Sequence, residues 1–294
     1  MNLKNDVKNE LLLFIVVLSI GVFVSIAFSF MVLKPYWGTI FNGAQLDMLS
    51  LPREKTISLQ VISMIGFFII PPVLFSLFSK NEFMETFNLH RIFSVKKYLY
   101  AFLLALVLFP VLINIQYLVM QIPFPESWKA IAEAQRAANE SIIAMFLDYP
   151  GIPNLVFMIF MIGVGAGLTE ELFFRGLLLP LFKKWFNSKW AAIILSSAIF
   201  SLFHLNAYDF LPILLVGILF GYLYTKTWDL KLNIFIHAVY NSFQVVLNYF
   251  KNQNLIDLDI NNVDYVPIWL WVLCFIAAGI FLKLILKENE HIST

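Results

Sequence analysis

Residues 154–182 read NLVFMIFMIGVGAGLTEELFFRGLLLPLF, and this stretch decides the fold class. Its only ionisable side chains are Glu170, Glu171 and Arg175. A helix rises about 1.5 Å per residue, so about 20 apolar residues cross the roughly 30 Å hydrocarbon core of a bilayer. The stretch is longer than that, and it predicts a tilted helix that spans a membrane.

The whole chain has the composition of a membrane protein. It has 294 residues, 60% of them hydrophobic and 13% charged, with a mean hydropathy of +0.80. A soluble domain carries about 25% charged residues. The net charge is +1, and no stretch looks like a basic arm, so no nucleic-acid partner is expected. The single cysteine, Cys274, excludes an internal disulfide framework and a CxxC metal site.

Apolar runs recur along the sequence and predict a polytopic, all-α helical bundle of about eight transmembrane helices. The predicted spans are 11–33, 57–79, 98–121, 154–182, 190–206, 210–226, 232–250 and 266–286. They must be helices, because backbone polar groups inside a bilayer have to be satisfied within the segment. With no internal repeat or linker, residues 1–294 are predicted to form one integral membrane domain.

Lysine and arginine residues fall unequally on the two sets of connections between the spans. One set holds Lys4, Lys8, Lys80, Arg91, Lys96, Lys97, Lys183, Lys184, Lys189, Lys226, Lys231, Lys283 and Lys287. The other set holds Lys34, Arg53, Lys55, Lys129, Arg136 and Lys251. The positive-inside rule therefore predicts that both termini are cytoplasmic. The Phe-, Ile-, Lys- and Asn-rich composition favours an AT-rich bacterial genome, and hence a bacterial cell membrane.

Two outer connections are longer than simple turns. Residues 34–56 look irregular, whereas residues 123–152 contain an alanine-rich stretch that favours helix. Near one face of that helix fall Trp128, Ile131, Ala138 and Ile142, although Gln135 interrupts the face. An interfacial helix that covers the bundle and a surface helix without a role both fit this pattern.

Five ionisable side chains lie inside otherwise clean spans: Glu170, Glu171, Arg175, His204 and His237. A charge at this depth is costly, so such residues usually face the bundle interior and mark a function. The i,i+4 spacing lets Arg175 pair with Glu171 and leaves Glu170 free to face a cavity. Glycines precede the pair and allow a close helix contact or a local break.

Two further i,i+4 pairs complete the pattern: Phe200 with His204, and His237 with Asn241. Glu-Glu-x-x-x-Arg, Phe-x-x-x-His and His-x-x-x-Asn, in this order on separate membrane helices, resemble the CAAX-protease and bacteriocin-processing family, also called the Abi family. Its eukaryotic and archaeal members are of the Ras-converting-enzyme type. The resemblance covers roughly residues 155–250.

The resemblance implies a glutamate-dependent intramembrane endopeptidase whose substrate is a membrane-embedded or lipidated peptide or protein. It implies that Glu170 and His204 activate water and that His237 and Asn241 stabilise the oxyanion. Glu171, Arg175 and, in the second motif, Phe200 would support the site. It implies no cofactor.

Other functions stay open at this point. The zinc signature His-Glu-x-x-His is absent and no metal is expected, yet Glu170, His204 and His237 could be three metal ligands. A catalytically silent scaffold, such as an immunity or regulatory protein, would fit the same fold. A proton-coupled transporter would use the same residues as a relay, although transporters often show internal repeats.

Overall fold

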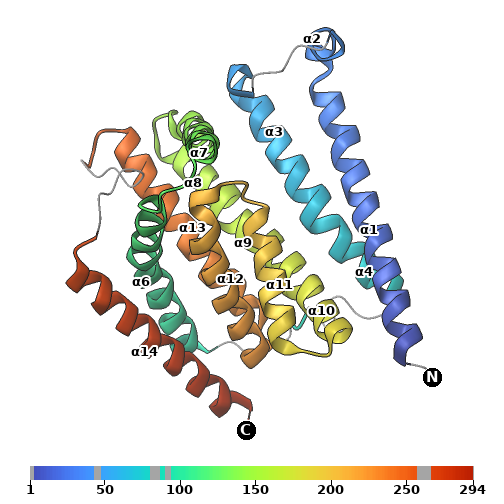
Figure 1. Cartoon of the computed structure of the whole chain (residues 1–294), viewed down its shortest axis with the longest axis vertical. Coiled ribbons are helices and arrows are strands. Elements are labelled where there is room, and N and C mark those ends of the chain that lie inside the picture. Colours follow the sequence, from blue (N-terminus) through green and yellow to red (C-terminus); the bar gives the residue numbers. More distant parts are fainter. Residues whose placement is uncertain (1–2, 43–47, 80–86, 90–93, 257–265, 294) are drawn as a thin grey trace.

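The computed structural model describes residues 3–42, 48–79, 87–89, 94–256 and 266–293, and the regular elements within them are helices (Figure 1). The α-helices are α1 Leu3–Val32, α2 Trp37–Phe41, α3 Arg53–Ser63, α4 Ile70–Ser79, α6 Val95–Met120, α7 Glu126–Leu147, α8 Ile152–Met158, α9 Ala166–Glu171, α10 Leu179–Phe186, α11 Lys189–Leu202, α12 Ala207–Thr227, α13 Leu230–Asn252 and α14 Ile268–Ser293. The short 3-10 helices η1 Lys34–Tyr36 and η2 Met48–Ser50 lie in the first outer connection, which was expected to be irregular. The predicted all-α class is confirmed.

Three π-helical segments join consecutive α-helices without a break. They are η3 Met64–Ile69 between α3 and α4, η4 Ile159–Gly165 between α8 and α9, and η5 Leu172–Leu178 between α9 and α10. The predicted spans 57–79 and 154–182 therefore each lie on one continuous helix whose winding changes along its length.

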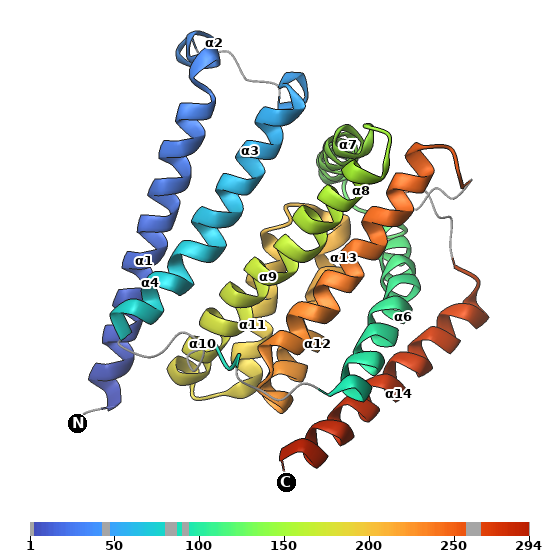
Figure 2. The same cartoon turned by 180° about the vertical axis from the view of Figure 1, so that it is seen from behind.

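The helices form a bundle with two flanks and a centre. Figures 1 and 2 show α1 beside α3 and α4 on one flank, and α6 beside α14 on the other. The centre is filled by α9, α11, α12 and α13. Both chain ends lie at the same end of the bundle (Figure 1), as the charge rule requires. The assignment of that end to the cytoplasm stays a prediction.

Six helical segments of the described residues are long and apolar enough to cross a membrane, fewer than the eight predicted. They are Val7–Val32, Arg53–Ser79, Val95–Met120, Ile152–Phe186, Ala207–Thr227 and Ile268–Glu290. The predicted span 190–206 is shorter, because α11 ends at Leu202 after 14 residues. The span 232–250 lies on α13, whose asparagines and other polar side chains lower its hydropathy. Both α11 and α13 pack against helices of the six candidate spans.

A buried ion pair fastens the turn before α13 to α6. The Lys97 ammonium lies 2.7 Å from the Asp229 carboxylate, and both side chains are buried. Asp229 also caps α13, because its Oδ1 accepts a hydrogen bond from the backbone N–H of Leu232. A capped and ion-paired turn fixes where α13 begins, and hence where its polar side chains lie.

Small residues bring α9 against α13. A Cβ atom added to Gly167 would lie 2.9 Å from the backbone nitrogen of Ala238, and one added to Gly163 would collide with Ser242. Ala238 follows His237, and Gly167 lies one helical turn before Glu171. The predicted close contact at these glycines therefore presents the two glutamates to His237.

The helix predicted within residues 123–152 is α7, which lies across one end of the bundle (Figure 1). Its side chains Phe146 and Leu147 are buried against α8 and α13, in a cluster with Met158 and Val245. Gln135 was expected to interrupt the apolar face. In the structure it lines the same cavity as Trp128 and Ile131, so the carboxamide is part of that face.

Candidate active site

The two glutamates lie on a short α-helical stretch between two π-helical segments. α9 contains six residues and ends at Glu171, η4 precedes it and η5 follows it. π-Helical turns inside α-helices are rare and occur frequently at functional sites. The local break that the glycines allowed is this change of winding, together with the close contact to α13.

Glu171 is fully buried and binds three neighbours. Its Oε1 accepts a hydrogen bond from Arg175 at 2.7 Å and lies 2.9 Å from Nδ1 of His237. Its Oε2 faces the carboxamide of Asn233, whose Nδ2 donates at 3.4 Å. The predicted pairing with Arg175 is confirmed. The contacts with His237 and Asn233 make Glu171 the centre of the site as well as a partner of the arginine.

Arg175 is buried and lies between two aromatic rings. Its guanidinium carbon is 4.6 Å from the centroid of Phe200 and 5.4 Å from that of Phe220, and its Nη2 donates to the carbonyl of Gly217 at 3.3 Å. Cation–π contacts away from water contribute about 2 kcal/mol. Arg175 therefore joins the first and second motifs through the ring of Phe200.

Glu170 lies next to His237 but forms no direct hydrogen bond with it. Its Oε2 is 3.7 Å from Nε2 of His237, which is longer than a hydrogen bond between nitrogen and oxygen. This Oε2 is buried and has no hydrogen-bond partner among the described residues. An unsatisfied carboxylate oxygen costs about 1–3 kcal/mol, so its presence beside a histidine points to a function.

His204 is joined to the others only through Phe200. Its Nδ1 lies 2.9 Å from the backbone carbonyl of Phe200, and its ring centroid is 5.0 Å from that of Phe200. The ring of His237 is 6.0 Å from the same phenylalanine. His204 is exposed beyond the end of α11, and no hydrogen bond or ion pair joins it to Glu170 among the described residues. The predicted cluster therefore contains Glu170 and His237, with His204 at its edge.

Asn241 is directed at the irregular helix opposite it. Its Nδ2 donates to the carbonyl of Ile162, in η4, at 3.4 Å. It lies one turn after His237 on α13, as the spacing predicted, but the two side chains contact different groups.

Asn233 is a site residue that the sequence analysis missed. It is fully buried, donates to Glu171 and donates to the Phe220 carbonyl at 2.9 Å. The signal was available, because Asn233, His237 and Asn241 follow one another at i,i+4 spacing on one helix.

Part of the chain that carries these site residues matches a known protein family. Residues 152–243 match the family described as Rce1-like, type II CAAX prenyl endopeptidase Rce1-like. This range holds all three motifs and the side chains that meet at Glu171. This segment of the chain is similar to the Rce1-like family. Searches among curated proteins and among solved structures gave no match.

The Rce1-like segment begins at the start of α8 and ends on α13, two residues after Asn241. It agrees with the predicted range of 155–250, so the resemblance is confirmed at the level of the family. With six candidate spans outside and inside this segment, the protein is a multi-pass integral membrane protein.

The metal-binding alternative would need Glu170, His204 and His237 to converge on one point. Among the described residues, no group of three or more His, Cys, Asp or Glu side chains is arranged to hold a metal ion. Glu170 and His237 approach each other, but His204 does not join them. Metal dependence is a question for experiment, addressed below.

Proposed function

We propose that this protein is an intramembrane endopeptidase that hydrolyses a peptide bond of a membrane-embedded or lipidated protein or peptide. The observation that carries the proposal is the buried, unpartnered Oε2 of Glu170, which lies 3.7 Å from Nε2 of His237. A water oxygen placed off the straight line between these two atoms can lie about 2.8 Å from each of them, which is a normal hydrogen-bond distance. Similarity to the Rce1-like family supports the same reaction.

Glu170 acts as the general base in this mechanism. Its carboxylate takes a proton from the water, the water oxygen attacks the carbonyl carbon, and the same proton then passes to the departing amine. The base has to be close to water and free of other partners. Glu170 meets this condition, whereas Glu171 is occupied by Arg175, Asn233 and His237.

His237 is oriented by Glu171 for a role at the developing oxyanion. Glu171 accepts from Arg175, and a carboxylate only accepts hydrogen bonds, so Nδ1 of His237 is the donor to Glu171. To stabilise an oxyanion, Nε2 of the same ring would also have to carry a proton, which would make His237 an imidazolium during the reaction. In that state the charges of His237 and Arg175 balance those of the two glutamates. The Asn241 carboxamide would be a second donor to the same oxygen.

His204 completes the proposed water-activating pair of the family. Since its Nδ1 is held by the Phe200 carbonyl, Nε2 is the nitrogen available to water or substrate. Both histidine rings pack edge-on against the ring of Phe200, so this phenylalanine sets the distance between the two histidines.

A catalytically silent scaffold is the second candidate, and one observation favours it. His204 is exposed and makes no contact with Glu170 among the described residues, which is unlike a preassembled pair. In the proposed enzyme, bound substrate closes this separation, because catalytic hydrogen bonds often tighten only in the complex.

Comparative proteomics of membrane peptides tests the proposal. Cells carrying the protein, the Glu170→Gln variant or no copy would be compared, with Glu133→Gln as a control for an exposed glutamate on α7. We expect cleavage products that depend on Glu170 and on His204 and that persist in Glu133→Gln. Identical peptide profiles with and without Glu170, from equal amounts of folded protein, would instead establish the scaffold.

A further inference from the structure

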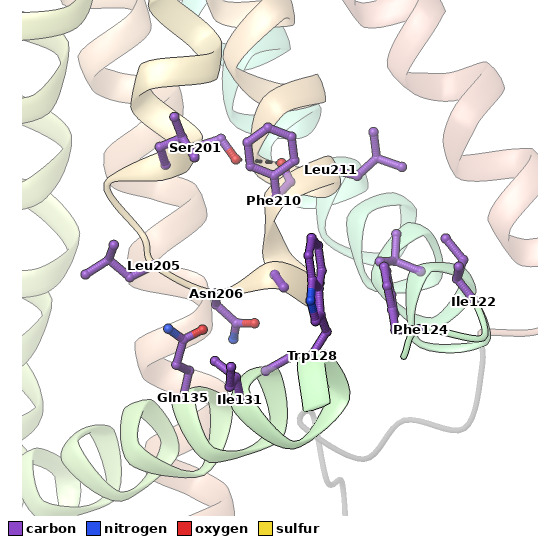
Figure 3. A pocket seen from close by; sticks show the side chains of 14 residues that line it. Ile122, Phe124, Trp128, Ile131, Gln135, Ser201, Leu205, Asn206, Phe210 and Leu211 are labelled. Atoms are coloured by element: carbon purple, nitrogen blue, oxygen red, sulfur yellow. Dashed lines mark hydrogen bonds between the residues drawn. The ribbon is translucent and has the colours of Figure 1, made fainter. Parts of the chain in front are cut away.

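A large apolar cavity lies between α7 and the connection that joins α11 to α12. Its volume is about 550 Å³, within the usual range of ligand pockets. Figure 3 shows its walls: Trp128 and Ile131 of α7, Phe124 before it, and Leu211 of α12. The connection between α11 and α12 forms the remaining side.

This connection also carries His204, so residues on both sides of this histidine in the sequence line the cavity. Ser201 and Leu202 precede the histidine, Leu205 and Asn206 follow it, and all four line the cavity. The Ser201 hydroxyl donates to the Phe210 carbonyl at 2.6 Å, which ties the two helix ends together (Figure 3).

Leu205 is held in a strained conformation at the edge of the cavity. Its φ is +50°, a left-handed conformation that is rare for a branched side chain. The side chain is 73% exposed, although it is fully apolar. Backbone strain of this kind occurs at ligand-binding sites, where surrounding contacts maintain it. Here it occurs at a residue whose aliphatic side chain lines the cavity.

Two carboxamides, those of Asn206 and Gln135, belong to the lining, most of which is apolar (Figure 3). Asn206 is 5% exposed, and its Oδ1 caps α12 by accepting from the backbone N–H of Tyr208. Its Nδ2 makes no hydrogen bond among the described residues, and neither does the side chain of Gln135. These groups can therefore offer hydrogen bonds to an occupant that has polar atoms.

We propose that this cavity binds the substrate residues next to the scissile bond, with a bulky apolar side chain in the lining and the peptide backbone on Asn206 and Gln135. This inference rests on the proposed peptidase function. An extended peptide offers both N–H and C=O groups to the two carboxamides. A lipid acyl chain offers neither, so the lining favours peptide over lipid.

A variant that fills the cavity tests whether the cavity determines which substrate side chain the protein prefers. Ala207 lines the cavity at the start of α12, and Ala207→Phe would occupy it. The matched control is Ala130→Phe, at an exposed position of α7 outside the lining. The reporters are peptides that differ only in Phe or Ala at each position near the cleaved bond. We expect the unmodified protein to prefer Phe at one position by at least about tenfold in kcat/KM.

Ala207→Phe should lower that preference by about tenfold or more, while Ala130→Phe keeps it. Asn206→Ala and Gln135→Ala should raise KM for both reporters alike, because backbone binding does not distinguish side chains. A preference that survives Ala207→Phe would overturn the proposal.

A binding measurement separates this proposal from the peptidase function. The probe is a synthetic transmembrane peptide of about 20 apolar residues with one benzoylphenylalanine, photolysed with the Glu170→Gln protein. Labelling of residues 201–211 and of α7, blocked by Ala207→Phe but not by Ala130→Phe, supports the cavity even if no reporter is cleaved. Labelling elsewhere, or a retained phospholipid that the peptide does not displace, overturns it.

Discussion

Nδ1 of His237 lies 2.9 Å from Oε1 of Glu171, the same carboxylate oxygen that accepts from Arg175 at 2.7 Å. One oxygen thus links a histidine on α13 to an arginine on η5. The second glutamate of the motif is therefore an orienting group for His237, and the first is left free for water.

Glu171→Gln should lower catalysis and also destabilise the protein, because it leaves the buried Arg175 guanidinium without its ionic partner. A glutamine keeps the size of the side chain and one accepting oxygen, but it removes the charge that balances Arg175 and His237. We expect kcat to fall by about 10²-fold, comparable to the loss of one oxyanion donor. Turnover and thermal unfolding in detergent, measured on the same preparation, check this. Unchanged kcat would mean that His237 does not need this carboxylate.

Arg175→Ala should lower the amount of folded protein. It strands the buried Glu171 carboxylate, and removing one partner of a buried pair costs about 3–5 kcal/mol. The matched control is Lys184→Ala, which breaks the exposed pair of Lys184 with Glu10 and should cost about 0–1 kcal/mol. Yield and unfolding temperature measure both. Normal folding of Arg175→Ala with selective loss of proteolysis would move the arginine into the catalytic group.

Gly167→Ala should separate α9 from α13. The new Cβ would lie 2.9 Å from the backbone nitrogen of Ala238, and overpacking of this kind costs about 1–3 kcal/mol. Gly279→Ala is the control, since no atom lies within 4 Å of a Cβ added there. We expect activity to fall in the first variant and to persist in the second. Equal activity in both would show that the close approach is dispensable.

Asn241→Ala should reduce kcat with little change in KM. The carboxamide donates at 3.4 Å to the Ile162 carbonyl, a long bond that it can exchange for an oxyanion. Removing one oxyanion donor typically costs about 10²–10³ in turnover. Asn248→Ala, which removes a carboxamide bonded within its own helix, is the control. A large rise in KM with kcat preserved would assign Asn241 to substrate binding.

Activity should persist after treatment with a strong chelator. Glutamate and histidine suffice to activate water, and the common zinc spacing is absent from the sequence. Purified protein would be treated, desalted and assayed with a reporter peptide. Loss of cleavage that returns with added zinc would replace the glutamate mechanism with a metalloenzyme.

Much of the fold was predictable from the sequence because apolar runs and charged connections are local signals. The pairing of Glu171 with Arg175 was predictable too, since helical spacing alone determines it. The π-helical segments were not, because neither length nor polarity encodes a change of winding.

The position of His204 could not be read from the sequence either. The apolar run continues to residue 206, but α11 ends at Leu202 and the histidine lies beyond it. Where a helix ends in this bundle depends on the tie between Ser201 and Phe210, a tertiary contact. Likewise, the role of Asn233 depends on how closely α9 and α13 approach.

The polarity of α13 has a consequence for biogenesis. A helix that carries Asn233, His237 and Asn241 partitions poorly into lipid when it leaves the translocon alone. Only Trp228 and Asp229 separate it from the apolar α12, so the two helices can enter the bilayer as a hairpin. The Lys97–Asp229 pair would then lock that hairpin against α6. We therefore expect α13, which carries the proposed oxyanion donors, to insert stably into the bilayer only together with its neighbouring helices.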